Sequence, residues 1–115
     1  MKEELEYRMY FLTMRNISEI QKGIQCGHAA IEYSLKYQDN PIYQEWVKNH
    51  KTFIILNGGV SNNGSSYPLG TMETYLLMLE EKGIRLAVFK EPDLNWSLSA
   101  IAFILDERVF NKNAY

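Results

Sequence analysis

The sequence has little of what would build a secreted, membrane-spanning or fibrous protein. It holds one cysteine, Cys26, and three prolines in 115 residues. A single thiol cannot close an internal disulfide, and no apolar run approaches the roughly 18 residues that a membrane-spanning helix requires. Four of the opening six residues are charged, and the segment lacks the apolar core of a signal peptide. We therefore expect a protein of the cytoplasm.

An excess of charge of one sign is also missing. Twelve Lys and Arg stand against fourteen Asp and Glu, which gives a formal net charge of -2. Such a chain repels polyanions as a whole, although a local basic patch can still bind an anion. Apolar residues make up 46% of the chain, and no internal repeat or change in composition divides it. These values predict a single globular domain over residues 1–115.

Apolar runs of strand length alternate with helical patterns along the chain. Strands are expected at 10–14, 52–57, 84–89 and 98–105, and helices at 19–37, 41–49 and 71–82. Ser18 stands three residues before Gln21, the spacing of a helix-capping pair, and Thr71 is expected to cap the third helix. The order predicts an α/β domain with a mostly parallel sheet, helices on both faces and an antiparallel last strand.

Two stripes follow the helix expected at 19–37. The apolar stripe recurs at three- and four-residue spacing and is predicted to face the core: Ile20, Ile24, Gly27, Ile31 and Leu35. A polar stripe would lie beside it, made of Gln21, Gln25, His28 and Glu32. The near-continuous apolar run at 52–57 predicts a strand that is covered on both faces.

Ligands of open α/β sheets bind beyond the carboxyl ends of the parallel strands. That edge and the helix that starts there supply the candidate ligand-binding residues, namely Arg15, Asn16, Ser18, Gln25, His28, Asn57, Gly58, Gly59, Lys90, Glu91, Asp93, Asn95 and Trp96. Cations and a helix N-terminus suit a phosphate, a carboxylate suits ribose hydroxyls, and an aromatic ring suits a base. The set favours a small nucleotide.

Several of these residues have a structural interpretation beside the functional one. Gln21 is typical of a capping partner, and His28 is either an acid–base group or a histidine buried in the helix. Trp96 either stacks on a base or covers the core. The stretch 58–70 is either a lid or a disordered loop. Cys26 is interpreted as a packing residue, and no ligand spacing for a metal is present.

The residues Met14-Arg15-Asn16 and Gln25-Cys26-Gly27-His28-Ala29-Ala30 resemble the archaeal/eukaryotic-type peptidyl-tRNA hydrolase family. The resemblance implies a three-layer α/β/α sandwich on a four-stranded sheet, a homodimer or higher homo-oligomer, and cleavage of the ester between peptide and tRNA without a cofactor. His28, Asp93 and Lys22 would then be catalytic. Gln21 stands where the family carries a functional lysine, and Lys22, one residue later, lies about 100° around the helix.

Small phage-encoded proteins look like a closer branch, because they share the Gln-x-x-His-Ala helix and the segment 91–95 without the lysine-rich turn. From this we predict a non-catalytic protein of the host cytoplasm that binds and sequesters a small nucleotide-like ligand, such as a host immune signalling nucleotide. Peptidyl-tRNA hydrolysis is the alternative, and only it would make tRNA a partner. No metal, cofactor or membrane partner is expected.

Overall fold

The computed structural model describes residues 5–61 and 70–110 and shows an α/β domain. Its main elements follow one another as β1 (Tyr7–Met14), α1 (Glu19–Tyr37), α2 (Pro41–Glu45), β2 (Thr52–Gly59), α3 (Thr71–Glu81), β3 (Leu86–Glu91) and β4 (Ser97–Asp106). A π-helical turn, Trp46–His50, extends α2, and single 3-10 turns follow β3 at Pro92–Leu94 and β4 at Glu107–Phe110. Every strand and helix that the sequence predicts is present in the predicted order.

The four strands form one mixed sheet in the order β2-β1-β4-β3. β1 and β2 are parallel, whereas β4 runs antiparallel to both of its neighbours. The antiparallel last strand is thus confirmed, but the mostly parallel sheet is wrong, because only one pair is parallel. All ten residues of β4 are buried, and this apolar strand inserts between β1 and β3 instead of adding to the edge.

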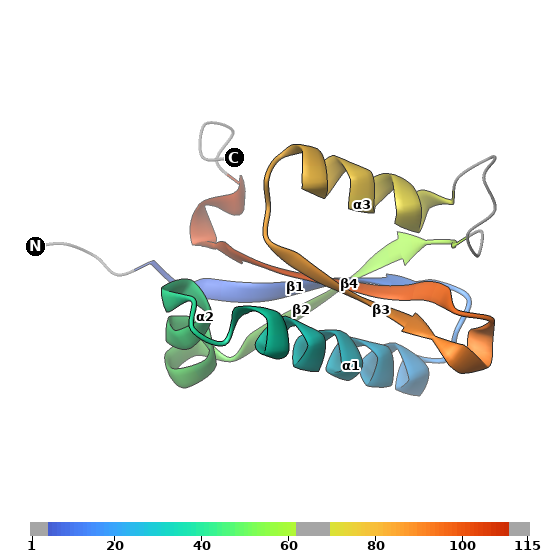
Figure 1. The fold of residues 1–115 in the computed structure, drawn as a ribbon, viewed down its shortest axis with the longest axis horizontal. Coiled ribbons are helices and arrows are strands. Elements are labelled where there is room, and N and C mark those ends of the chain that lie inside the picture. Colours follow the sequence, from blue (N-terminus) through green and yellow to red (C-terminus); the bar gives the residue numbers. More distant parts are fainter. Residues whose placement is uncertain (1–4, 62–69, 111–115) are drawn as a thin grey trace, which may run out of the picture.

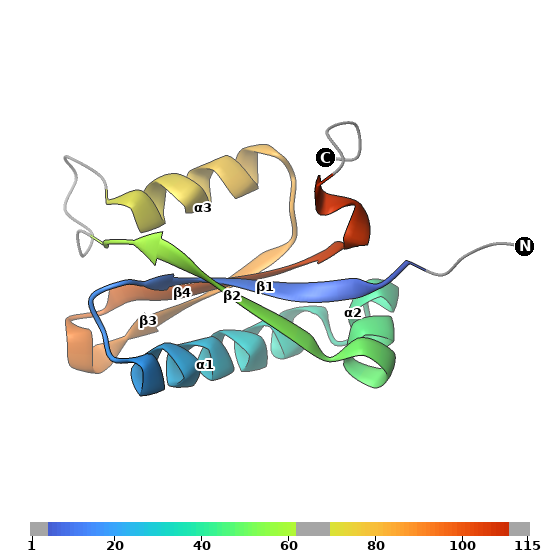
Figure 2. The same ribbon diagram turned by 180° about the vertical axis from the view of Figure 1, so that it is seen from behind.

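The helices lie on opposite faces of the sheet, with α1 and α2 on one side and α3 on the other (Figures 1 and 2). Side chains of Met9, Phe11 and Tyr33 belong to the core beneath α1. Tyr10, Leu12, Met72, Ile101 and Phe103 belong to the core beneath α3. Successive residues of a strand point to opposite faces, so β1 contributes to both cores. Among the described residues, no helix is long and apolar enough to cross a membrane.

The buried face of α1 is not the predicted one. Its buried residues are Gln25, Cys26, Ala29 and Tyr33, whereas Ile20, Ile24, Ile31 and Leu35 are exposed. The small side chains of Cys26 and Ala29 let the helix axis approach the sheet, and Tyr33 fills the remaining space against Tyr37 and Tyr43. Apolarity alone therefore points to the wrong side of this helix.

β2 is an edge strand, so the prediction that both of its faces are covered is also wrong. Phe53, Ile55 and Leu56 are each more than two-fifths exposed. α1 packs against β3 and β4, at the far side of the sheet, and leaves the β2 side of that face open. Phe53 is covered in part by Trp46, whose ring centroid lies 5.7 Å away.

The start of α3 is organised differently from the prediction. The N-cap residue is Gly70, and the hydroxyl of Thr71 instead donates to the Gly58 carbonyl at 2.9 Å and accepts from the Val60 amide at 2.8 Å. Thr71 therefore fastens α3 to the end of β2. The choice between a lid and a disordered loop at 58–70 concerns residues 62–69, which lie outside the described residues.

Candidate ligand-binding site

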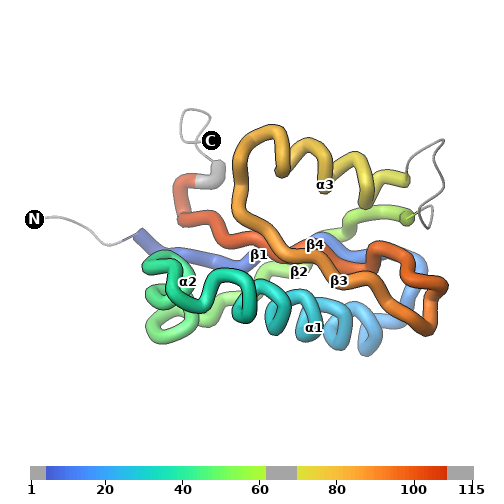
Figure 3. Tube along the Cα trace, viewed as in Figure 1, coloured from blue at the N-terminus to red at the C-terminus, as the bar shows by residue number. Residues whose placement is uncertain are grey.

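The carboxyl ends of β1, β2 and β3 lie at one end of the molecule, together with the starts of α1 and α3 (Figure 3). At this end β2 carries an irregularity, since Thr13 pairs with Asn57 and Met14 with Gly59, which leaves Gly58 as an extra residue. The Arg15 amide donates to the Gly59 carbonyl at 2.8 Å. This irregularity is a β-bulge. Bulges bend a strand and are common beside binding sites, and this one bends the end of β2 toward α3.

A hollow of about 210 Å³ opens at this place and is lined by Arg15, Asn57, Gly58, Gly59, Thr71 and Tyr75. Arg15 is exposed, and within the part of the chain that the structure describes its guanidinium makes no hydrogen bond or ion pair. The Asn57 side-chain oxygen accepts from the Gly59 amide at 2.8 Å, which leaves the amide nitrogen of Asn57 for another partner. The hollow thus offers unused donors.

Both glycines of the hollow are required by packing. A Cβ on Gly58 would lie 2.2 Å from the Met72 sulfur and 3.2 Å from the Leu12 Cβ. Gly59 has a φ of 86°, and a Cβ there would lie 1.9 Å from the Thr71 hydroxyl oxygen. This fold needs the two glycines whether or not a ligand approaches them. Because glycine has no side chain, only backbone atoms line the hollow at these two positions.

Tyr75 is the lining residue that sequence analysis missed. The helical pattern places it on the core face with Met72, Leu76 and Leu79, yet only Met72 is buried and Tyr75 is 40% exposed. A tyrosine at the margin of an apolar stripe combines an apolar ring with a polar tip, and this residue type commonly stands where a core meets solvent. That marginal position is the signal that could have identified Tyr75.

A buried polar network ties α1 to β3 and β4 at the same end. Gln25 is fully buried, accepts from the Ser99 hydroxyl at 2.6 Å, and donates to a Glu91 carboxylate oxygen at 2.9 Å. The other carboxylate oxygen of Glu91 accepts from the Asp93 amide at 3.4 Å. Gln25 therefore cannot touch a ligand directly; it holds Glu91 in place.

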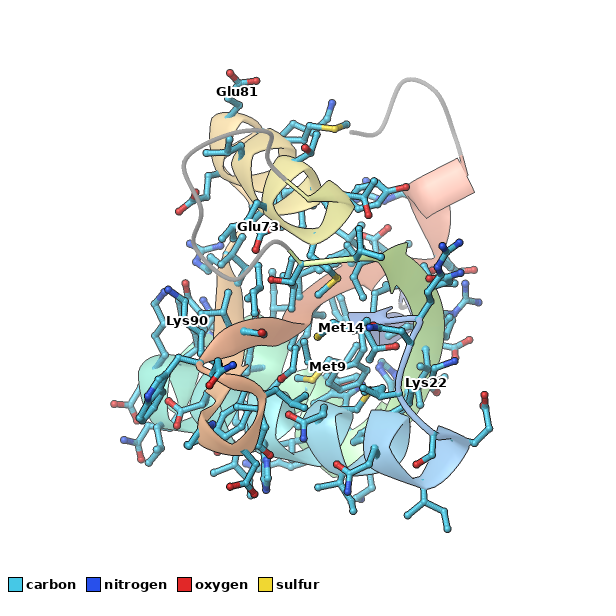
Figure 4. The ribbon with its side chains drawn as sticks, turned by 90° about the vertical axis from the view of Figure 1, so that its right-hand side faces the viewer. Met9, Met14, Lys22, Glu73, Glu81 and Lys90 are labelled. Atoms are coloured by element: carbon cyan, nitrogen blue, oxygen red, sulfur yellow. The ribbon has the colours of Figure 1, made fainter. Side chains whose placement is uncertain are left out.

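His28 lies on the flank of α1 that faces β3. Its ring centroid is 4.4 Å from that of Phe89, and its Nδ1 is buried without a hydrogen-bond partner among the described residues. Lys22 pairs with Glu19 at 3.2 Å, and in Figure 4 it lies on the opposite side of the sheet end from Lys90. Asp93 is exposed in the 3-10 turn after β3. No hydrogen bond or ion pair between described residues joins Lys22, His28 and Asp93.

The hairpin between β3 and β4 presents the remaining candidates. Asn95 and Trp96 adopt left-handed backbone angles, with φ of 55° and 61°. Glycine is the usual residue at the second such position, because a bulky side chain is strained there. Trp96 is nevertheless 65% exposed, so it does not cover the core. Lys90 is also exposed, and its ammonium group has no hydrogen bond or ion pair among residues 5–61 and 70–110.

The predicted residues therefore separate into groups. Arg15, Asn57, Gly58 and Gly59 share the hollow, with Asn16 and the helix cap Ser18 in the exposed turn that follows β1. Ser18 accepts from the Gln21 amide at 3.1 Å, as a capping residue does. Lys90, Glu91, Asp93, Asn95 and Trp96 belong to the hairpin. The hollow lining contains no hairpin residue.

A second hollow of about 330 Å³ lies at the other end of the sheet and contains none of the predicted residues. Its lining includes Tyr7, Tyr33, Lys82, Arg85 and Asp106. In the described part of the chain, no three His, Cys, Asp or Glu side chains gather as a metal site would require. Burial raises the pKa of Cys26 to about 11, so its thiol is protonated at neutral pH and serves as packing.

The chain matches no protein-family model and no curated protein. The candidate site is therefore defined by geometry alone: the hollow at Arg15 brings together four of the predicted residues, from the end of β1 and the end of β2.

Proposed function

We propose that this protein binds a small nucleotide-like anion at the hollow between β1, β2 and α3. The observation that carries the proposal is one hollow that holds the Arg15 guanidinium, the side-chain nitrogen of Asn57 and the half-exposed ring of Tyr75, where neither nitrogen group has a partner among residues 5–61 and 70–110. A guanidinium binds phosphate oxygens through two parallel hydrogen bonds, and a phenol ring offers a surface on which a base can stack. Phosphate and base would thus each have a partner.

The lining supports binding without turnover. Its six residues include no histidine, carboxylate or thiol, which are the usual general acids, bases and nucleophiles. The Thr71 hydroxyl is occupied by the Gly58 carbonyl and the Val60 amide. A ligand that enters would find charge, hydrogen-bond donors and an aromatic surface, but no group that activates water. Retention of the ligand, and hence sequestration, is the function this chemistry supports.

The resemblance to small phage-encoded members of the peptidyl-tRNA hydrolase family belongs to the same proposal. The placement of α1 and α3 on opposite faces of the sheet supports a three-layer arrangement of the kind the resemblance implies. Hydrolysis of peptidyl-tRNA is the second candidate. It is favoured by one observation, a histidine on the flank of α1 that faces β3, whose Nδ1 has no hydrogen-bond partner among the described residues.

Two assays on the same preparation test the proposal. Thermal unfolding is followed with AMP, ADP and a cyclic dinucleotide, since a ligand that binds only the folded chain raises the Tm. Peptidyl-tRNA cleavage is measured in parallel. We expect at least one nucleotide to raise the Tm and no cleavage above background. Cleavage that disappears in His28→Ala would reverse the order of the two functions, and the absence of any nucleotide effect would refute the binding proposal.

A further inference from the structure

The outer face of α1 is an apolar stripe that the described residues leave uncovered. Ile20, Ile24, Ile31 and Leu35 are 77%, 42%, 60% and 66% exposed, and Gly27 lies between the two pairs. The opposite side of the helix, with Gln25, Cys26, Ala29 and Tyr33, is already packed against the sheet. A helix that is apolar on both sides is normally buried on both sides. A row of exposed aliphatic side chains this long marks an interaction surface.

The spacing of the stripe identifies what fits on it. When a second α1 is laid antiparallel across the first, with the two-fold axis midway between residues 27 and 28, every large side chain meets another. Ile20 then faces the partner's Leu35, and Ile24 faces the partner's Ile31. Contacts of this kind, in which one patch binds its own copy, are typical of two-fold dimers. We propose that a second copy of this chain docks on α1 in this antiparallel register, a proposal independent of the ligand site.

The centre of the stripe is shaped for close approach. A Cβ placed on Gly27 or on Gly23 would meet no atom of the described residues within 4 Å. Two helices can therefore cross at Gly27 with their backbones near each other, which lets the flanking isoleucines interdigitate. On one flank the stripe borders Gly23, Ser34 and Gln38, which are uncharged, and on the other flank it borders His28 and Glu32. In the antiparallel register Glu32 faces the partner's Gly23, so this carboxylate does not meet its own copy across the two-fold axis.

The size of the stripe sets the expected strength of the dimer. The 19 residues of α1 span about 28 Å, and a helix face about 10 Å wide gives a contact of roughly 300 Å². Stable interfaces bury about 800 Å² per partner, so the stripe alone is in the weak class. We therefore expect a reversible dimer whose population increases with protein concentration.

Light scattering over a concentration series tests the proposal. The mass should rise from 13.4 kDa at low concentration toward twice that value. Ile31→Glu should hold the protein at monomer mass at every concentration, because it places a carboxylate opposite the partner's Ile24. Leu77→Glu is the matched control, since Leu77 is an exposed aliphatic residue on α3. It should dimerise like the parent chain. Circular dichroism checks that both variants fold.

Cross-linking tests the antiparallel register. Ile24→Cys and Ile31→Cys, mixed and oxidised, should form a disulfide-linked pair. Ile24→Cys alone should not, because its two copies would be seven residues apart along the axis, about 10.5 Å, which exceeds the reach of a disulfide. The native Cys26 is buried and does not compete. A parent chain that stays monomeric, a dimer that survives Ile31→Glu, or equal cross-linking by Ile24→Cys alone would each overturn the proposal.

Discussion

Trp96 has a left-handed backbone conformation, which glycine adopts without strain. We therefore expect a glycine variant at this position to be more stable than an alanine variant. With φ at 61°, any residue with a Cβ is strained at this position by roughly 1–2 kcal/mol. Glycine removes that strain but adds about 0.4–1 kcal/mol of chain entropy to the unfolded state. Trp96→Gly should therefore be about 0.5–1 kcal/mol more stable than Trp96→Ala. In most strands and helices the order is the reverse.

Urea denaturation of the two variants measures this difference, and Gly83→Ala provides the reference. Gly83 has a φ of 71° and open space where a Cβ would lie, so the substitution reports backbone strain without a clash. It should lower the free energy of unfolding by about 0.5–1 kcal/mol. If Trp96→Ala is as stable as Trp96→Gly while Gly83→Ala is destabilised, the strain assigned to the hairpin is wrong. Because no hairpin residue lines the hollow at Arg15, Trp96→Gly should leave nucleotide affinity unchanged, and a loss of about 1–3 kcal/mol would show instead that Trp96 stacks on the ligand.

Three further predictions concern the buried side of α1. Gln25→Leu should lower the free energy of unfolding by about 1–3 kcal/mol in urea titrations, because it leaves Ser99 and Glu91 without their partner in the network. Glu32→Ala, an exposed change on the same helix, is the control, and a loss in Gln25→Leu no greater than in Glu32→Ala would show that the network contributes nothing. Cys26 should resist alkylation by iodoacetamide at pH 8 until the chain is unfolded, since burial raises its pKa to about 11 and leaves little thiolate. The same raised pKa means that stability should decline as pH rises from about 9 toward 11, where the thiol of the unfolded chain ionises first. Rapid alkylation of the folded chain would show that Cys26 is not buried.

The elements of the fold could be predicted because each carries a local signal. Ser18 caps α1 as its spacing to Gln21 indicates, and the helix spans Glu19–Tyr37 as the pattern predicts. Asn40 accepts hydrogen bonds from the first amides of α2, ahead of Pro41. Such signals depend on neighbours in the chain and need no knowledge of the tertiary structure.

What could not be predicted depends on contacts between distant segments. Both sides of α1 carry apolar residues, so the periodicity could not tell which side packs on the sheet. The insertion of β4 between β1 and β3 places β2 at the edge, and this leaves Phe53 half-exposed although its segment resembles a buried strand. Because Arg15 follows β1 whereas Trp96 lies in the hairpin between β3 and β4, the same strand order places these two residues in different parts of the candidate edge. Tyr75 joins the site only because α3 returns to the end of β2.

Calorimetric titration of three proteins with the nucleotide that raises the Tm most tests the central claim directly. The proteins are the parent chain, Arg15→Ala and Arg85→Ala, where Arg85 is an exposed arginine in the hollow at the other end of the sheet. A charge-assisted bond to phosphate contributes about 1.5–3 kcal/mol, so Arg15→Ala should weaken binding ten- to a hundredfold. Arg85→Ala should leave the affinity nearly unchanged. Equal losses in both variants, or a larger loss in Arg85→Ala, would contradict a binding site between β1, β2 and α3.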